Sequence, residues 1–126
     1  MSGVTYDTGA LIAAERGSKS VWWLHRDLLE RGMYPTLPAV VLGQAWRGGP
    51  QARLSRLVRG CRVESLTEQQ ARSAGAALAA SGSSDLIDAA VVMAALMRGD
   101  LVVTSDPDDL RRIASAIGRD LALHVI

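Results

Sequence analysis

Four aspartates stand at positions where their carboxylates could act together. Asp7 ends the apolar stretch "VTY", Asp106 ends "LVVTS", and Asp85 and Asp88 lie three residues apart in "SDLID". Carboxylates held close together repel one another, and a divalent cation relieves that repulsion. Oxygen ligands select a hard ion such as Mg²⁺ or Mn²⁺, which can activate water for attack on a phosphodiester. If the fold gathers these four residues, we therefore expect a metal site.

Helix capping is a second explanation for each of these segments. In "SDPDDL", Asp106 or the serine before it can cap a helix whose first residue is Pro107 and whose next two acids face the positive end of the dipole. Asp85 can cap a helix with Asp88 in its first turn, and Asp7 can cap the helix after it. No single aspartate therefore identifies a site, and the hypothesis depends on the combination.

The chain alternates short apolar stretches with longer helical patterns. Helix signals such as Gly32, Pro38 and the capping-box spacing of Thr67 and Gln70 separate these stretches. The expected strands are residues 4–6, 33–37, 61–66, 100–105 and 121–126. The expected helices are residues 8–15, 18–31, 38–46, 51–59, 67–80, 85–98 and 107–117. The helix at 85–98 is almost wholly apolar, so we expect it to be buried.

Strands that alternate with helices in this way form a parallel sheet covered by helices on both faces. Ligands of such sheets bind outside the carboxyl ends of the strands, near the point where the strand order reverses. Asp7 directly follows the first expected strand, and Asp106 directly follows the fourth. If these strands are neighbours, both carboxylates lie at one edge of the sheet, where Asp85 and Asp88 can join them.

Four segments, which together span nearly the whole chain, resemble the PIN-domain family and, within it, the VapC toxins of bacterial toxin–antitoxin pairs. They are "YDTGALIA", "LPAVVLGQAWRGG", "SDLIDAAVVMAAL" and "LVVTSDPDDL". The resemblance implies one PIN-like domain over residues 1–126, with a three-layer α/β/α fold around a parallel sheet of about five strands in the order 3-2-1-4-5. It also implies a Mg²⁺- or Mn²⁺-dependent endoribonuclease, a cognate VapB-like antitoxin that holds it inactive, and a homodimer.

Carried over by position, the resemblance implies catalytic roles for Asp7, Asp88 and Asp106. The eighteen-residue step from Asp88 to Asp106 identifies the third acid of the family pattern. Asp85 is an additional acid one helical turn earlier, and we expect it to assist as a metal ligand. Auxiliary roles fall on three further polar residues of the fourth segment, which are Thr104, Ser105 and Asp109.

The second motif departs from the family pattern. Where members usually have glutamate, this chain has Gln44. An amide oxygen can coordinate a cation weakly or hold a water, but it brings no charge, so the site loses one anion unless Asp85 compensates. An alternative therefore stays open, in which a catalytically degenerate PIN domain acts as an RNA- or antitoxin-binding module. Gln44 could also be an ordinary polar residue on an exposed helix face.

Arginine dominates the fourteen basic residues, since only Lys19 is a lysine. Arginine suits bidentate phosphate contacts, although a GC-rich genome produces the same bias. Arg47 follows the second-motif helix, and Arg53 and Arg56 form a stripe with Arg59. Arg47, Arg53 and Arg56 are candidate contacts for RNA or an antitoxin. Complementarity to a helix C-terminus explains Arg47 equally well, and a solvated helix face explains the stripe.

Adjacent tryptophans mark a further candidate surface. Trp22 and Trp23 lie on one expected helix, where neighbouring side chains point about 100° apart. They cannot both face one core. Part of this helix is therefore a candidate dimer or antitoxin surface.

Composition argues against several other classes of function. One cysteine precludes an internal disulfide or a thiolate metal cluster, and the absence of Phe argues against a base-stacking platform. No Ser–His or Cys–His nucleophile pattern is present, and the acids lack the spacing of haloacid-dehalogenase-type phosphatases. The longest uncharged apolar run, residues 89–97, is short for a membrane span, and no secretory signal is visible, so we expect a cytoplasmic protein.

Overall fold

Five short strands form the centre of the molecule. The structure, a computed structural model, describes residues 3–126, and residues 1 and 2 of the expected domain lie outside it. The strands are β1 (Val4–Tyr6), β2 (Thr36–Pro38), β3 (Arg62–Glu64), β4 (Leu101–Thr104) and β5 (Leu123–Val125). The helices are α1 (Thr8–Glu15), α2 (Lys19–Glu30), α3 (Ala39–Ala45), α4 (Ala52–Arg59), α5 (Glu68–Ser81), α6 (Leu86–Arg98) and α7 (Pro107–Ala116). The elements follow the order expected from the sequence.

All pairings in the sheet are parallel, and the strand order is β3-β2-β1-β4-β5, which confirms the expected order. The central strand β1 pairs with β2 through Thr5 and Thr36, and with β4 through Tyr6 and Val103. The direction in which successive strands are added reverses between β1 and β4. The carboxyl ends of these two strands therefore form the edge at which such sheets place their ligands.

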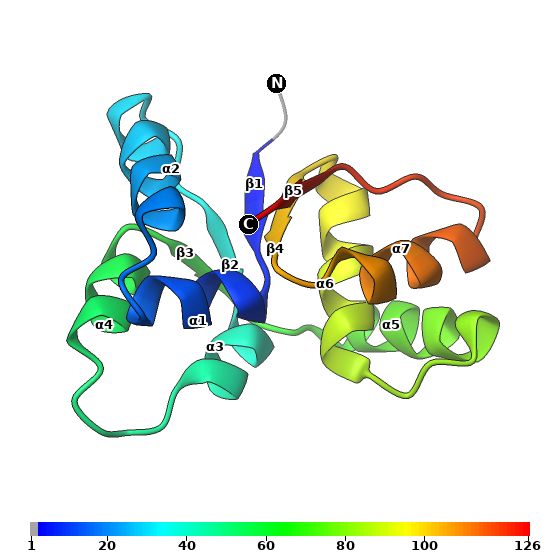
Figure 1. Ribbon diagram of the computed structural model, residues 1–126. Helices are drawn as coiled ribbons and strands as arrows, with labels where there is room; N and C mark the ends of the chain where they lie inside the picture. The colour runs from blue at the N-terminus through cyan, green and yellow to red at the C-terminus, as the bar shows by residue number, and fades with distance from the viewer. Residues whose placement is uncertain (1–2) are drawn as a thin grey trace.

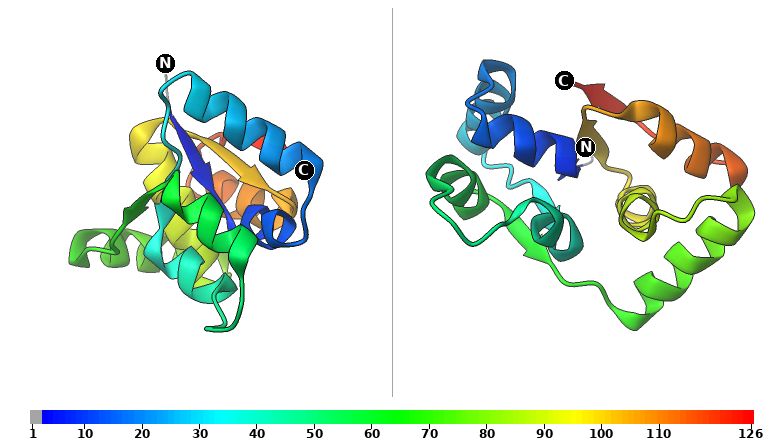
Figure 2. Two further views of the ribbon diagram at one scale, coloured as in Figure 1. Left: turned by 90° about the vertical axis from the view of Figure 1, so that its left-hand side faces the viewer. Right: turned by 60° about the horizontal axis from the view of Figure 1, so that its bottom comes forward.

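Helices cover both sides of the sheet. Helices α1 to α4 lie on one side, and α5, α6 and α7 lie on the other (Figures 1 and 2). The two groups are each held by their own contacts, since α1 packs on α3 and α4, and α5, α6 and α7 pack on one another. The expected three-layer α/β/α arrangement is confirmed.

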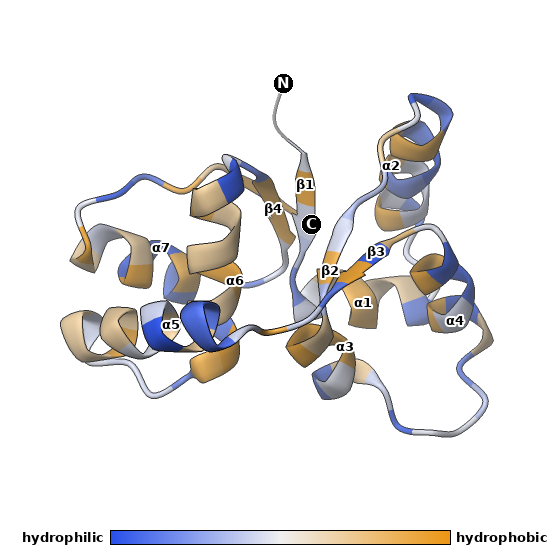
Figure 3. Cartoon of the chain, turned by 180° about the vertical axis from the view of Figure 1, so that it is seen from behind, coloured by the Kyte–Doolittle hydropathy of each residue, from blue (hydrophilic) through white to orange (hydrophobic). Residues whose placement is uncertain are grey.

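Apolar side chains from the strands and from α6 form the core. Tyr6, Val102 and Val103 on the sheet are fully buried, as are Val91 and Val92 on α6. Figure 3 shows hydrophobic residues on β1, β2 and β4, between the two helical layers. Six residues of α6 are buried, which confirms the expectation for this helix. Each large apolar side chain buried in this way stabilises the fold by about 1.5–3 kcal/mol.

Side-chain caps fix the starts of α5 and α6, whereas one expected helix start is wrong. The capping box that begins α5 is present, with Gln70 donating its backbone N–H to the Thr67 hydroxyl at 3.1 Å and its side chain accepting from the Thr67 N–H at 2.9 Å. The expectation that Pro38 opens a helix is wrong, because Pro38 is the last residue of β2 and α3 begins at Ala39. The fixed φ of proline suits both structures, and a ψ of 134° keeps Pro38 extended.

No single helix within residues 3–126 is both long and apolar enough to cross a membrane. Helices α5 and α6 reach that length and composition only as a pair, and the pair is bent by 111° at its junction.

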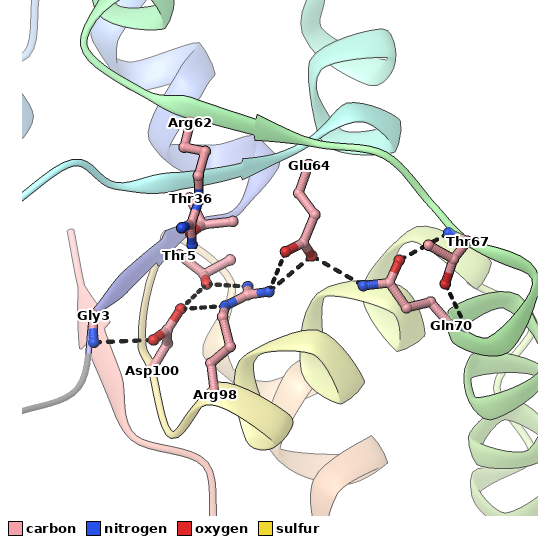
Figure 4. A network of polar contacts seen from close by, with 9 residues as sticks. All are labelled: Gly3, Thr5, Thr36, Arg62, Glu64, Thr67, Gln70, Arg98 and Asp100. Carbon is pink, nitrogen blue, oxygen red and sulfur yellow. Dashed lines mark hydrogen bonds and ion pairs between the residues drawn. The ribbon is translucent and has the colours of Figure 1, made fainter.

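A network of polar contacts ties β1, β3 and β4 together around Arg98 (Figure 4). The Asp100 carboxylate is almost fully buried and accepts hydrogen bonds from the Gly3 N–H at 3.0 Å, the Thr5 hydroxyl at 2.8 Å and Arg98 Nε at 2.9 Å. Arg98 Nη1 also pairs with Glu64 at 2.6 Å. Because both oxygens of Asp100 have partners, its buried charge is compensated.

Removing Asp100 should therefore destabilise the fold strongly. We expect Asp100→Ala to lower the free energy of unfolding by about 3–5 kcal/mol, because Arg98 is left without its most buried partner. Glu30→Ala, which removes an exposed pair with Arg26, should cost less than about 0.5 kcal/mol. Urea unfolding followed by circular dichroism measures both, and equal losses would contradict a structural role for the network.

Candidate active site at the carboxyl edge of the sheet

The fold brings the segments that carry the aspartates to one edge. Asp7 directly follows β1, and its backbone N–H donates to the carbonyl of Val103 on β4 at 3.0 Å. Asp106 follows β4 and begins the turn into α7. Asp85 caps the start of α6, where its Oδ1 accepts from the Asp88 N–H at 3.0 Å. We refer to these four residues together with Asp109 as the acidic cluster.

Asp7 is the most deeply buried member of the acidic cluster, with 5% of its surface exposed. Its Oδ2 accepts a hydrogen bond from the Thr104 hydroxyl at 2.8 Å. Its Oδ1 is the one fully buried side-chain oxygen or nitrogen within residues 3–126 that has no hydrogen-bond partner. Burial raises the pKa of Asp7, the Thr104 hydroxyl and the nearby Thr8 backbone N–H lower it, and the charges of Asp85 and Asp106 raise it further. A buried oxygen without a partner is costly, and a cation is one of the few groups that would satisfy it.

Asp88 shows that the members of the cluster act on one another. Burial, followed by the charges of Asp85, Asp7, Asp109 and Asp106, raises its pKa to about 7. All four other members of the cluster therefore contribute to the electrostatic potential at Asp88. At neutral pH a large fraction of this carboxyl group holds a proton, which limits the repulsion within the cluster.

Asp106 lies on the solvent side of the cluster. The charge of Asp109 is the largest of the effects that raise the pKa of Asp106, and Arg112 acts in the opposite direction. Asp109 itself forms an ion pair with Arg112 at 3.1 Å. The expected auxiliary residue Asp109 thus lies beside Asp106, while its own charge is shared with an arginine.

The acidic cluster is not arranged as a finished coordination site. No three His, Cys, Asp or Glu side chains in the described part of the chain are grouped so that they could hold a metal ion together. The donor chemistry suits Mg²⁺ or Mn²⁺, because the groups are carboxylates and one buried oxygen of Asp7 has no partner. A cation held here would therefore require side-chain rearrangement among the exposed acids.

Thr104 connects the two strand ends. Its hydroxyl donates to Asp7 and accepts from the Asp106 N–H at 3.0 Å, so that one side chain orients both segments. Ser105, the other expected polar neighbour, lies against Gly9 in the first turn of α1. A Cβ on Gly9 would stand 2.0 Å from the Ser105 hydroxyl and 2.9 Å from its backbone nitrogen. The end of β4 can approach α1 this closely only because residue 9 has no side chain.

Gln44 lies beside the acidic cluster. It is exposed on α3, and its amide oxygen accepts a hydrogen bond from the hydroxyl of Thr8, the residue after Asp7. The second motif is thereby linked to the start of α1. The contact that the structure assigns to Gln44 is with Thr8.

The three candidate arginines differ in their surroundings. Arg47 follows α3 and lines a hollow that Gln44 also lines. Arg53 donates to the Glu15 carbonyl at 3.2 Å, and the Arg56 guanidinium stacks 5.1 Å from the Trp22 ring centre. Arg53 and Arg56 are therefore engaged with α1 and α2.

The adjacent tryptophans separate as the helical geometry requires. Trp22 packs against the core and donates its indole N–H to the Ala14 carbonyl at 2.9 Å. Trp23 is 71% exposed. The outer face of α2 therefore presents a large aromatic side chain to solvent.

Comparisons with known proteins bear on the fold. No family model and no curated protein matches the chain. A chain in the crystal structure of VapBC2 from Rickettsia felis bound to a DNA fragment from their promoter is similar over 98% of each chain, with 15% sequence identity and a TM-score of 0.74. The present protein has a PIN-like fold. PAE2754 from Pyrobaculum aerophilum is similar to this PIN-like fold over 91% of this chain and 84% of its own, with 13% identity and a TM-score of 0.62.

Sequence reasoning did not single out two residues of this edge. Thr8 makes the link to Gln44, and Gly9 permits the approach of Ser105. A glycine in the second position of a helix, directly after the strand-end aspartate, was the available signal for Gly9, because glycine is otherwise unfavourable in a helix.

The raised pKa of Asp88 predicts how stability depends on pH. The folded protein holds this proton more tightly than an exposed aspartate with the ordinary pKa of 3.8. The contribution of Asp88 to folding is therefore fully present below about pH 4 and is lost as the pH rises through about 7. In EDTA at pH 8, Asp88→Asn should raise the free energy of unfolding by roughly 1–2 kcal/mol, after allowance for screening at this half-buried position.

Thermal unfolding of both proteins between pH 5 and pH 8, at about one-unit steps, checks this expectation. The difference in Tm should shrink toward the acid end. A difference that stayed constant across the range would show that the ionised form of Asp88 is not under strain.

Two glycine substitutions should have opposite effects. Gly9→Ala should destabilise the fold by about 1–3 kcal/mol, because the new Cβ overlaps both the hydroxyl and the backbone of Ser105. Gly75→Ala on the exposed face of α5 should stabilise it by about 0.5–1 kcal/mol, because nothing lies within 4 Å of the new Cβ. Chemical denaturation measures the pair, and a stable Gly9→Ala protein would contradict the close approach.

Proposed function

We propose that this protein is a Mg²⁺- or Mn²⁺-dependent endoribonuclease that acts as the toxin of a VapBC-type pair. The observation that carries the proposal is the buried Asp7 carboxylate, whose Oδ1 has no partner and which lies in electrostatic contact with Asp85 and Asp106. Its position at the carboxyl edge of a PIN-like sheet supports the same assignment. The residues that would hold the ion are Asp7, Asp85, Asp88 and Asp106.

Asp7 and Asp106 would have different roles in the site. Asp7 is held in one orientation by Thr104 and by its burial, so its free oxygen is presented at a fixed place. Because Asp106 is exposed, its side chain can adjust to the substrate. The turn that carries it is anchored, since the Asp106 N–H donates to the Thr104 hydroxyl. A bound Mg²⁺ or Mn²⁺ supplies a Lewis acid that favours hydroxide over water and offsets charge on the phosphate. No nucleophilic side chain is required for such hydrolysis.

Electrostatics also favour a cation for substrate binding. The carboxylates of the acidic cluster would repel an RNA phosphate, and their mutual repulsion already raises the pKa of Asp88. Positive charge for the rest of the RNA chain is available on Arg47, which lines a hollow with Gln44, and on Arg53 and Arg56 of α4. A phosphodiester substrate therefore suits the charges around the cluster once its own negative charge is offset.

A VapB-like antitoxin and a second copy of the chain are the partners we propose. The similar R. felis protein is a VapBC2 described as bound to a DNA fragment from their promoter, which supports a partner of the VapB kind. The exposed Trp23 on α2 supports a protein contact at that face, either with the antitoxin or in a homodimer. A toxin of this type would act in the cytoplasm, where its RNA lies.

A second candidate function is a binding module that does not cut RNA. Two observations favour it. Gln44 stands where the resemblance leads us to expect a glutamate and accepts a hydrogen bond from Thr8, and no three acids within residues 3–126 are grouped to hold a metal ion. A metal-free PIN-like domain could still bind RNA or an antitoxin through its arginines.

Cleavage of a labelled RNA separates these candidates. With Mn²⁺ we expect cutting by the wild type, no cutting in EDTA, and a loss of more than about 100-fold in Asp7→Asn, since even partners that only orient metal ligands are worth about 10–100-fold. Asp120→Asn, an exposed acid outside the cluster, is the matched control and should cut normally. Cutting that survives both EDTA and Asp7→Asn would rule out the metal-dependent mechanism.

The variant Gln44→Glu distinguishes the nuclease from the module. For a nuclease, the added carboxylate should tighten Mn²⁺ binding in calorimetry while the wild type still binds and cuts. If only Gln44→Glu binds Mn²⁺ and cuts RNA, the natural chain is the binding module.

A further inference from the structure

We propose that a hollow between α1, α3 and the start of α4 binds one phosphate of the RNA chain next to the cleavage point. This inference rests on the proposed function and names the contact that the substrate makes outside the acidic cluster. The hollow has a volume of about 230 Å³, and its polar lining includes Arg16, Arg47 and Gln44. We refer to it as the arginine hollow.

Two cations at the rim of the arginine hollow are available for a ligand. Arg16 caps the end of α1, and Arg47 follows α3. Both side chains are exposed, and neither forms an ion pair with a carboxylate among residues 3–126. Arg47 uses one of its five N–H donors on the Trp46 carbonyl at 2.9 Å, so the others remain for an anion.

The one carboxylate that lines the arginine hollow is already engaged. Glu15 Oε2 accepts the Leu54 N–H at 2.7 Å, in the first turn of α4. The positive end of the helix dipole of α4 offsets this negative charge. Two arginines therefore face one partly neutralised carboxylate, and the hollow has an excess of positive charge.

The loop that carries Arg47 is anchored. Gln51 Oε1 accepts the Arg47 N–H at 2.7 Å, and Gln51 Nε2 donates to the Ala45 carbonyl at 3.1 Å. The backbone that carries Arg47 is therefore fixed against the end of α3 before any ligand binds. Because this backbone is already ordered, Arg47 loses less conformational entropy when its side chain binds an anion.

Gln44 connects the arginine hollow to the acidic cluster. It lines the hollow and accepts a hydrogen bond from Thr8, which directly follows Asp7. A chain with a phosphate at every repeat can therefore pass from the cluster across Gln44 into the hollow. This continuity favours RNA over an isolated acidic side chain as the occupant.

The arginines near the cluster differ in whether they are free to contact RNA. Arg53 donates to the Glu15 carbonyl, and Arg56 stacks on Trp22. Arg16 and Arg47, in contrast, line the arginine hollow. Arg16, which no sequence motif singled out, becomes a specific substrate contact. The basic stripe on α4 is then secondary for substrate binding.

Binding of a fluorescent single-stranded RNA in EDTA, measured by anisotropy from about 50 to about 200 mM salt, tests the proposal without cleavage. Arg16→Ala and Arg47→Ala should each weaken binding by up to about five-fold, as expected for one exposed charge pair. Each should also reduce the slope of log K against log salt by about 0.7, the value for one phosphate contact on a single strand. Arg47→Lys keeps the charge and should keep the slope.

Arg119→Ala is the matched control, because Arg119 is exposed on the loop after α7 and outside the hollow. If Arg16→Ala and Arg47→Ala change the affinity and the slope no more than Arg119→Ala does, the proposal is overturned. The same holds if the two variants weaken binding of a glutamate-rich peptide and leave RNA binding unchanged, because the hollow would then serve a protein partner.

Failure of the proposed function gives a different result. A wild type that never cuts RNA with Mn²⁺, yet shows the expected loss of affinity and slope in Arg16→Ala and Arg47→Ala, supports the hollow and the binding module together. A wild type that cuts RNA while both variants match Arg119→Ala supports the nuclease and overturns the hollow. Circular dichroism melting of each variant excludes misfolding as the cause.

Discussion

Asp7 keeps a carboxylate almost entirely out of solvent at the end of the central strand, with one oxygen bonded to Thr104 and the other without a partner. This arrangement depends on the pairing of β1 with β4, which brings Thr104 to Asp7 across ninety-seven residues of sequence. It also depends on Gly9, which lets the end of β4 approach the first turn of α1. The chemistry available at this edge follows from that one constrained carboxylate.

Charges are compensated inside the protein at one part of the sheet and left uncompensated at another. Around Arg98, the buried Asp100 and the nearby Glu64 both pair with that one arginine, and this region stabilises the fold. In the acidic cluster, the other carboxylates together raise the pKa of Asp88. Arg112, at the solvent side, offsets part of this negative charge near Asp106. The first arrangement therefore supports a structure that can hold the second, whose repulsion is relieved only by protons or by a cation from solution.

The fold was largely predictable because its signals are local. Alternating apolar runs gave the strands, the pair Thr67 and Gln70 gave a helix start, and the apolar composition of residues 85–98 gave the buried helix. The convergence of the first and fourth strands followed only from the strand order that the family resemblance implies. Pro38 was misassigned because the φ of proline suits a helix and a strand equally, and only ψ separates them.

The details of the candidate site were not predictable, because they depend on contacts between distant segments. The residues next to Asp7 in the sequence do not indicate that one of its oxygens lacks a hydrogen-bond partner. The absence of a partner depends on how α1 packs against β4 and α6. The bond between Thr8 and Gln44 joins residues 36 positions apart in the sequence, on two helices that only the folded structure brings together. Arg16 carries no motif, and its role emerges only from the hollow it lines with Arg47. Metal binding by the aspartates stays a prediction.

The parallel topology has a consequence for when the site can come into being. The strand that carries Asp7 is made first, yet it pairs directly with β4, whose residues follow almost a hundred positions later. A nascent chain leaving the ribosome therefore exposes Asp7 long before Thr104 and Asp106 exist to join it. An N-terminal fragment that ends before Thr104 lacks the hydroxyl that orients Asp7, so it cannot contain the assembled edge.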